Sequence, residues 1–205
     1  MQHPQNHQYF RRHAATVTFL ASLTLTSAWA GSQNANLPNF QKVNDQVYRG
    51  AQPSNSGFQD IAKVGIKTVI DLREIGEHSQ ADEQKVVTDL GMRYVSIPMH
   101  GMSTPDSADV AKVLALFNDT ASGPVFVHCK RGADRTGTVV AVYRISHDGW
   151  DNKKALSEAK SYGMSMFERA MQHYVSDYKP ASAVTLASSG VDRAAASGAE
   201  TRAVQ

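Results

Sequence analysis

The sequence contains very little cysteine: one residue, Cys129, in a chain of 205. A single thiol cannot form an intrachain disulfide and cannot supply a cysteine-rich zinc site. The chain also has little net charge, since its formal charge at pH 7 is +2. This near balance gives no bulk electrostatic reason to bind nucleic acid or an anionic membrane surface. We therefore expect neither a nucleic-acid partner nor a cysteine-rich zinc site.

A long hydrophobic run is also lacking. The main apolar stretch, residues 14–27, is too short and too rich in Thr and Ser for a good transmembrane helix. Arg11-Arg12 precede it, and Ala28-Trp29-Ala30 offers small residues where a signal peptidase reads. We expect residues 1–30 to be a secretory signal peptide, which places the mature protein in the periplasm or outside the cell, without a stable membrane anchor. A short buried helix or an uncleaved anchor is the alternative.

The stretch around which the chain is organised runs over residues 124–137. An apolar run at residues 125–127 follows Gly123-Pro124, which is typical of a buried strand. Cys129 comes at the end of this strand, and Arg135 follows after five intervening residues. The next segment is apolar enough to predict a buried helix. In an oxidising compartment, an unpaired cysteine in such a place is more often a working thiol than a structural one.

The residue types of this loop fit the binding of an anion. A thiolate is a strong nucleophile, and a helix N-terminus with a ring of backbone N–H groups stabilises it. The same N–H groups can bind a phosphate. Gly132 permits the backbone angles that aim these groups inward, and Arg135 can hold two phosphoryl oxygens with its planar guanidinium. Thr136 can hydrogen-bond the sulfur and help it leave.

The pattern His-Cys-x-x-Gly-x-x-Arg-Thr-Gly over residues 128–137 resembles the signature of the cysteine-dependent protein tyrosine and dual-specificity phosphatases. With Lys130 and Asp134 at its variable positions, the signature is most similar to that of the compact atypical dual-specificity phosphatases of plants, fungi and bacteria. Some members of that branch act on inositol pyrophosphates or phosphoinositides. The resemblance covers residues 46–178. It implies hydrolysis of phosphate monoesters through a phosphocysteine intermediate, without metal or cofactor. The expected substrate is a phosphorylated protein or a small polyanionic phosphate ester.

The resemblance also assigns roles within the loop. Cys129 is the expected nucleophile, Arg135 the phosphate-binding residue, and Thr136 the partner of the departing sulfur. The residues expected to contact the substrate are Lys130, Arg131, Gly132, Ala133, Asp134 and Arg135. The basic pair among them favours a polyanionic substrate.

A phosphatase of this kind also needs a general acid, normally a carboxylic acid on a mobile loop. Asp106 is the first candidate, because it lies 23 residues before Cys129 at a loop-to-helix junction, roughly where the family carries its acid. It could equally be a helix N-cap. Asp134 is the second candidate, and it could instead pair with a neighbouring cation or stabilise the loop. His100 and Asp109 are weaker alternatives.

Three further residues admit two interpretations each. Arg49, in Tyr-Arg-x-x-Gln-Pro, resembles a segment near the catalytic pocket of this branch, but it could be an ordinary surface charge. Arg73 follows a predicted strand and could assist anion binding or form a structural salt bridge. The His128 side chain should point away from its neighbour on the strand, and we expect it to hydrogen-bond the loop backbone.

Strand and helix signals alternate along the chain, which predicts an α/β fold with a central, largely parallel sheet and helices on both faces. Residues 31–39 are expected to be a flexible leader, residues 40–179 the dual-specificity-phosphatase-like catalytic domain, and residues 180–205, rich in Ala, Ser and Gly, a disordered tail. Met164, Met166 and Phe167 are expected in the core.

Three rival functions share parts of this chemistry. A rhodanese-type sulfurtransferase also uses a loop cysteine after a strand, but the Arg135-Thr136-Gly137 continuation argues against it. An inactive phosphatase that only binds phosphate would keep the same loop. An arsenate reductase would need further resolving cysteines, which this chain lacks.

Overall fold

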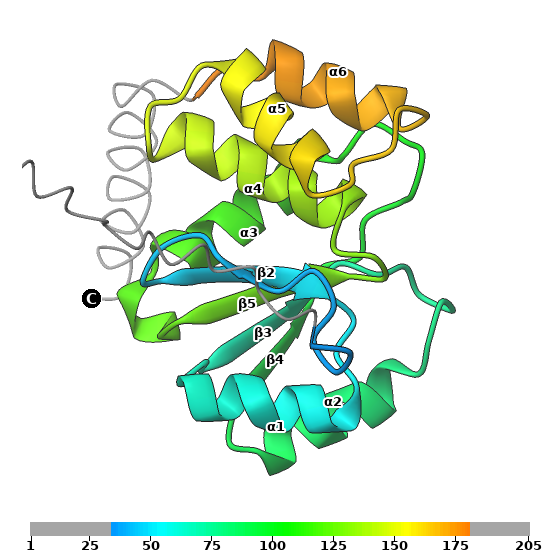
Figure 1. The fold of residues 1–205 in the computed structure, drawn as a ribbon, viewed down its shortest axis with the longest axis vertical. Helices are drawn as coiled ribbons and strands as arrows, with labels where there is room; N and C mark the ends of the chain where they lie inside the picture. Colours follow the sequence, from blue (N-terminus) through cyan, green and yellow to red (C-terminus); the bar gives the residue numbers. More distant parts are fainter. Residues whose placement is uncertain (1–33, 181–205) are drawn as a thin grey trace, which may run out of the picture. The chain divides into compact units, whose positions relative to one another are not determined.

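The computed structural model describes residues 34–180; the predicted signal peptide and all but the first residue of the predicted tail lie outside them. Its sheet has the strand order β1-β2-β5-β3-β4 (Figure 1). The strands are β1 (Gln41–Lys42), β2 (Val47–Ala51), β3 (Thr68–Asp71), β4 (Arg93–Ser96) and β5 (Val125–Cys129). β1 pairs antiparallel with β2, whereas β2, β5, β3 and β4 pair in parallel. The predicted largely parallel sheet is confirmed.

Helices cover both faces of this sheet, as the sequence predicted (Figure 1). They are α1 (Asn55–Val64), α2 (Gln80–Asp89), α3 (Ser107–Asn118), α4 (Asp134–Ser146), α5 (Asn152–Ser161) and α6 (Arg169–Asp177), with a short 3-10 turn η1 at Thr120–Ser122. Successive residues of a strand point to opposite faces. Phe126 therefore packs with α1 and α2, and Val127 packs with α3 and α4. Among the described residues, no helix has both the length and the apolar character to cross a membrane.

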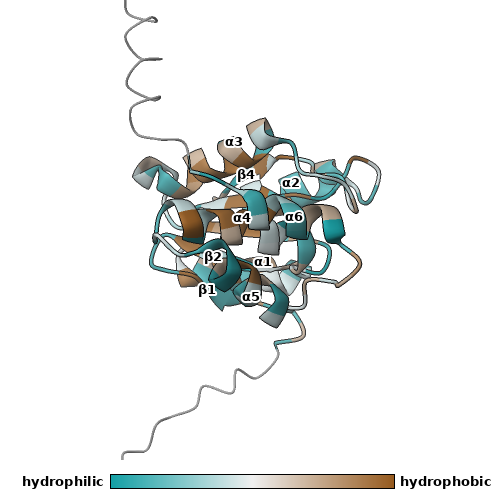
Figure 2. Ribbon diagram, turned by 90° about the horizontal axis from the view of Figure 1, so that it is seen from above, coloured by the Kyte–Doolittle hydropathy of each residue, from teal (hydrophilic) through white to brown (hydrophobic). Residues whose placement is uncertain are grey.

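The central helix α4 is buried on nearly all sides. Eleven of its thirteen residues are buried, because it lies between the sheet and the outer helices α5 and α6. Its apolar character, in contrast to the more hydrophilic α5 and α6, is visible in Figure 2. Because α4 directly follows β5 and its loop, its N-terminus lies at the carboxyl edge of the parallel strands.

Two segments differ from the sequence-based expectations. Residues 34–39, part of the predicted flexible leader, pack against the domain: Leu37 is buried, and the Asn36 carbonyl accepts a 3.0 Å hydrogen bond from the Ser54 amide. Met166 and Phe167 are not in the core, because they lie in the loop between α5 and α6 and are 74% and 75% exposed.

Candidate active site

The predicted catalytic loop connects β5 to α4 at the carboxyl edge of the parallel strands (Figure 1). Cys129 is the last residue of β5 and is 2% exposed, and Arg135 is the second residue of α4. The fold thus brings thiol and guanidinium to the two ends of one short loop. Ligands of open α/β sheets bind at this edge, where the first amides of a helix carry partial positive charge.

Successive carbonyl groups of the loop are bonded to donors outside it. The Gln52 amide donates to the Lys130 carbonyl (3.3 Å). The Asn39 side-chain amide donates to the carbonyls of Arg131 (3.3 Å) and Gly132 (3.1 Å). In a planar trans peptide the C=O and the N–H point in opposite directions. Holding these oxygens outward therefore turns the following N–H groups toward the inside of the loop.

Arg49 supplies a further donor to this set. Its Nη2 donates to the Gly132 carbonyl at 2.8 Å, and its guanidinium carbon lies 4.2 Å from the centre of the Tyr162 ring. The side chain is 1% exposed, so the interpretation as a surface charge is wrong. Burial lowers the pKa of Arg49 to about 10, which still leaves the group charged at neutral pH. The protein therefore keeps a fixed positive charge behind the catalytic loop.

Gly132 is required at its position for two reasons. Its φ is +66°, a left-handed conformation that favours glycine. A Cβ there would lie 2.3 Å from the carbonyl carbon and oxygen of Gly50, closer than any real contact. The loop can rest on the backbone of β2 only because residue 132 has no side chain.

Arg135 is held by Glu77, from the loop between β3 and α2. Nη1 lies 2.5 Å from Oε1 and Nη2 lies 3.1 Å from Oε2, and Nη1 also approaches the carbonyls of Leu72 and Met99. Burial lowers the pKa of Arg135, but the bonds to Glu77 and the charge of that carboxylate outweigh burial and raise it overall. No acceptor for Nε is found among the described residues, so this N–H group is free to bond a ligand.

Asp134 links the catalytic loop to the loop between α5 and α6. One carboxylate oxygen pairs with Arg131, and the other accepts a 2.8 Å hydrogen bond from the Ser165 amide. Both oxygens are therefore engaged, as the loop-stabilising interpretation of Asp134 requires. The charge of Arg131 is balanced by this pair, while Lys130 beside it is exposed.

Thr136 and Ala133 complete the loop. Thr136 is fully buried, and its hydroxyl has no hydrogen-bond partner among the described residues. A buried hydroxyl without a partner costs free energy, so a bond to the Cys129 sulfur would stabilise it. Ala133 is buried as well, and its carbonyl accepts the Gly137 amide at 2.8 Å as α4 begins.

Asp106 lies at the end of the loop that follows β4, residues 97–106, and is exposed. Its Oδ1 accepts a 2.7 Å hydrogen bond from the Ala108 amide, so it is the N-cap of α3. A capping carboxylate at the surface can still exchange protons with a ligand. Asp109 and His100, the weaker candidates, each pair with a charged neighbour.

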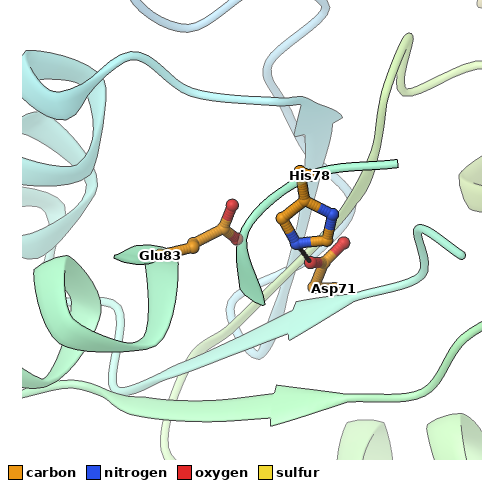
Figure 3. A group of neighbouring side chains, drawn as sticks. All are labelled: Asp71, His78 and Glu83. Carbon is orange, nitrogen blue, oxygen red and sulfur yellow. Dashed lines mark ion pairs between the residues drawn. The ribbon is translucent and has the colours of Figure 1, made fainter. Parts of the chain in front are cut away.

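A largely buried network of charges lies beside the end of β5, and Figure 3 shows three of its side chains, Asp71, His78 and Glu83. Nε2 of His128 lies 3.0 Å from Glu83 of α2, so this histidine pairs with a carboxylate and not with the loop backbone. Arg73 donates to Asp71 at 2.9 Å and also to Glu83. His78 lies with its Nε2 2.8 Å from Asp71, the ion pair drawn in Figure 3. Arg73 is thus part of a structural salt bridge.

This network also contains a group of three potential metal ligands, Asp71, His78 and Glu83, whose ligand atoms lie within 4.8 Å of one another. The guanidinium of Arg73 already bonds both carboxylates, which is the place that a cation would take. We therefore assign this cluster a structural role.

Comparison with known proteins agrees with this geometry. Residues 20–177 match the family model described as "DSP-PTPase phosphatase fused to NAD+ Kinase". The chain is 31% identical over 140 residues to the dual specificity protein phosphatase TpbA of Pseudomonas aeruginosa, covering 66% of this chain and 59% of that protein. It is 27% identical over 150 residues to the inositol diphosphatase DSP5 of Arabidopsis thaliana, covering 69% and 70%.

Solved structures show the same fold. The crystal structure of P. aeruginosa TpbA superposes with a TM-score of 0.59 at 29% identity, covering 69% of this chain and 85% of that one. The core catalytic domain of the S. cerevisiae PP-IP phosphatase SIW14 superposes with a TM-score of 0.64 at 21% identity, covering 74% and 92%.

The chain therefore belongs to the DSP-PTPase family, within the dual-specificity-phosphatase-like superfamily. Among its relatives are both the dual specificity phosphatase TpbA and the inositol diphosphatase DSP5. The chain spans about three fifths of the length of the TpbA sequences that it matches.

Replacing Glu83 tests the buried network. Glu83→Gln leaves Arg73 and His128 without a full counter-charge, so we expect the free energy of unfolding at neutral pH to fall by about 3 kcal/mol. Burial raises the pKa of Glu83, but the bond and charge of His128 lower it below its usual 4.5. The charge therefore stabilises the fold above pH 4.5, and this stabilisation is lost as pH falls through the lower native value.

Urea unfolding of wild type and Glu83→Gln, at neutral pH and in acid, measures this difference in stability. The difference in the free energy of unfolding between wild type and Glu83→Gln should be smaller in acid than at neutral pH. The exposed neighbour substitution Gln84→Ala is the matched control and should show no such difference. An equal difference in the free energy of unfolding at both pH values would contradict the stabilising role of the Glu83 charge.

Replacing Arg49 tests the support behind the loop. Arg49→Met removes the donor to Gly132 and the buried charge while keeping most of the side-chain volume. We expect alkylation of Cys129 by iodoacetamide at neutral pH to slow about tenfold, because the thiolate is less stabilised. Arg169→Met, at an exposed arginine, is the control. Unchanged alkylation in Arg49→Met, in a protein that still unfolds cooperatively, contradicts the role of Arg49.

Proposed function

We propose that the protein is a phosphatase that hydrolyses phosphate monoesters of tyrosine, or of tyrosine and serine or threonine, through a phosphocysteine intermediate. The observation that carries the proposal is the loop between β5 and α4, which has a buried thiol at one end, a buried guanidinium at the other, and its carbonyls bonded outward. Its relatives support this proposal. TpbA is named a dual specificity phosphatase, and one crystal structure contains it in complex with phosphotyrosine.

In the first step, the Cys129 thiolate attacks phosphorus in line with the leaving oxygen. The S–P bond forms as the P–O bond breaks, and the leaving oxygen takes a proton from Asp106. The inward N–H groups of the loop and Nε of Arg135 stabilise the equatorial phosphoryl oxygens.

In the second step, a water attacks the phosphocysteine. Asp106, now a carboxylate, accepts a proton from this water, and the S–P bond breaks to release inorganic phosphate. Thr136 stabilises the sulfur that departs, and the thiolate is restored. Asp106 is favoured over Asp134 as the acid, because both carboxylate oxygens of Asp134 are already bonded within the protein.

A second candidate substrate is an inositol phosphate or phosphoinositide, hydrolysed by the same residues. Two observations favour it: the inositol diphosphatase DSP5 is a relative, and Lys130 places an exposed positive charge beside the catalytic cysteine. A third possibility, an inactive protein that binds phosphate, keeps the same loop.

Hydrolysis of p-nitrophenyl phosphate in reducing buffer tests the proposed function. We expect the wild type to be active and Cys129→Ser to lose roughly a thousandfold or more in kcat, because no other residue of the loop can act as the nucleophile. The exposed substitution Ser157→Ala is the control. Phosphate binding without hydrolysis by the reduced wild type would contradict the proposal that the protein is an enzyme. Turnover of thiosulfate would indicate a sulfurtransferase instead.

The pH dependence of kcat on phosphotyrosine identifies the general acid. A general acid must be protonated, so activity falls toward high pH as it ionises. Asp106→Asn should lower kcat about a hundredfold and remove this fall. Asp134→Asn should retain the decrease of kcat toward high pH and should lower the free energy of unfolding. The reverse pattern would make Asp134 the acid.

A further inference from the structure

Four large apolar side chains are exposed on three loops of the described structure: Ile75, Met102, Met166 and Phe167. We name this set the apolar rim. Their exposed fractions run from 72% to 80%. In Figure 1 all three loops lie on one side of the molecule, beyond the carboxyl ends of the strands. Apolar groups gathered at the surface in this way mark a binding site more often than chance.

Two of these loops contact the arginine of the catalytic loop. Ile75 is two residues from Glu77, whose carboxylate pairs with Arg135. Met102 is three residues from Met99, whose carbonyl lies 3.3 Å from the same guanidinium. Each of these loops is therefore bonded to Arg135 within two or three residues of an exposed apolar side chain.

The third loop is fixed in the same way. Ser165, directly before Met166 and Phe167, donates its amide to Asp134 of the catalytic loop at 2.8 Å. The Met102 amide donates to Glu168 at 3.0 Å, which joins the second loop to the third. All three loops are thus bonded to Arg135, to Asp134 or to one another, so the loops that carry the apolar rim border one site.

The charges of these loops discriminate between candidate substrates. Residues 72–79, 97–106 and 162–168 contain no lysine, and their one arginine, Arg73, is buried in its ion pairs. Their carboxylates are Glu74, Glu77, Asp106 and Glu168. In the catalytic loop the exposed cations are Lys130 and Arg131, of which Asp134 balances Arg131, and Arg169 is exposed directly after the third loop. A densely charged inositol polyphosphate would meet more carboxylates than exposed cations here.

We infer that the apolar rim binds the polypeptide around a phosphorylated residue and favours substrates with apolar side chains beside it. This inference rests on the proposed phosphatase function and names its substrate class. Burying apolar side chains of the substrate against the apolar rim supplies binding energy that a polyanion cannot gain. The phosphate occupies the catalytic loop, and the neighbouring residues of the peptide contact the apolar rim.

Two phosphotyrosyl peptides of equal length test this inference, one with leucine and valine beside the phosphotyrosine and one with aspartate and serine. The ratio of their kcat/KM values is the readout, and an inositol polyphosphate is assayed in parallel. The wild type should prefer the apolar peptide. Phe167→Ser and Ile75→Ser should each reduce the preference up to about tenfold. Val64→Ser, at an exposed apolar residue of α1, is the matched control and should retain the wild-type ratio.

Each outcome separates the two claims. If the wild type hydrolyses p-nitrophenyl phosphate but both peptides equally, the inference is overturned and the proposed function stands. The same holds if the inositol polyphosphate is the better substrate, or if Phe167→Ser and Ile75→Ser keep the wild-type ratio. If no phosphate ester is hydrolysed at all, the proposed function itself fails.

Discussion

The site depends on the outward bonding of the catalytic-loop carbonyls. A short loop can stabilise a thiolate or a phosphate only if its N–H groups face inward. Its carbonyl oxygens then face outward and need hydrogen-bond donors from outside the loop. Gln52, Asn39 and Arg49 are those partners. Arg49 lies in β2, Gln52 directly follows it, and Asn39 precedes β1, so the loop carbonyls are bonded from the edge of the sheet where β2 pairs with β5.

The other side of the loop is held by buried charge. Glu77 orients Arg135, and the network of Asp71, Arg73 and Glu83 holds His128, the residue before Cys129. Buried ion pairs contribute little net stability, because desolvation offsets their attraction. They do restrict geometry, since breaking one leaves a buried charge without a partner. The Glu77–Arg135 pair and the buried network therefore restrict the positions of Arg135 and His128 on either side of the catalytic loop.

The sequence predicted the features that depend on local pattern. The buried run at residues 125–127 and the alternating strands and helices predicted the sheet, and the spacing from Cys129 to Arg135 located the loop. The partners of these residues could not be predicted, because they come from far along the chain: Glu77 is 58 residues from Arg135, and Arg49 is 83 from Gly132. Phe167 is apolar, which suggested the core, but its loop is held at the surface by Asp134.

The central claim is that Cys129 carries the phosphoryl group during turnover. Rapid acid quench of the enzyme with p-nitrophenyl phosphate, followed by mass spectrometry of its proteolytic peptides, tests this directly. The account predicts a phosphate adduct on the peptide containing Cys129, formed at a rate no slower than turnover. Turnover with no adduct on this peptide, or with an adduct on another residue, would contradict it.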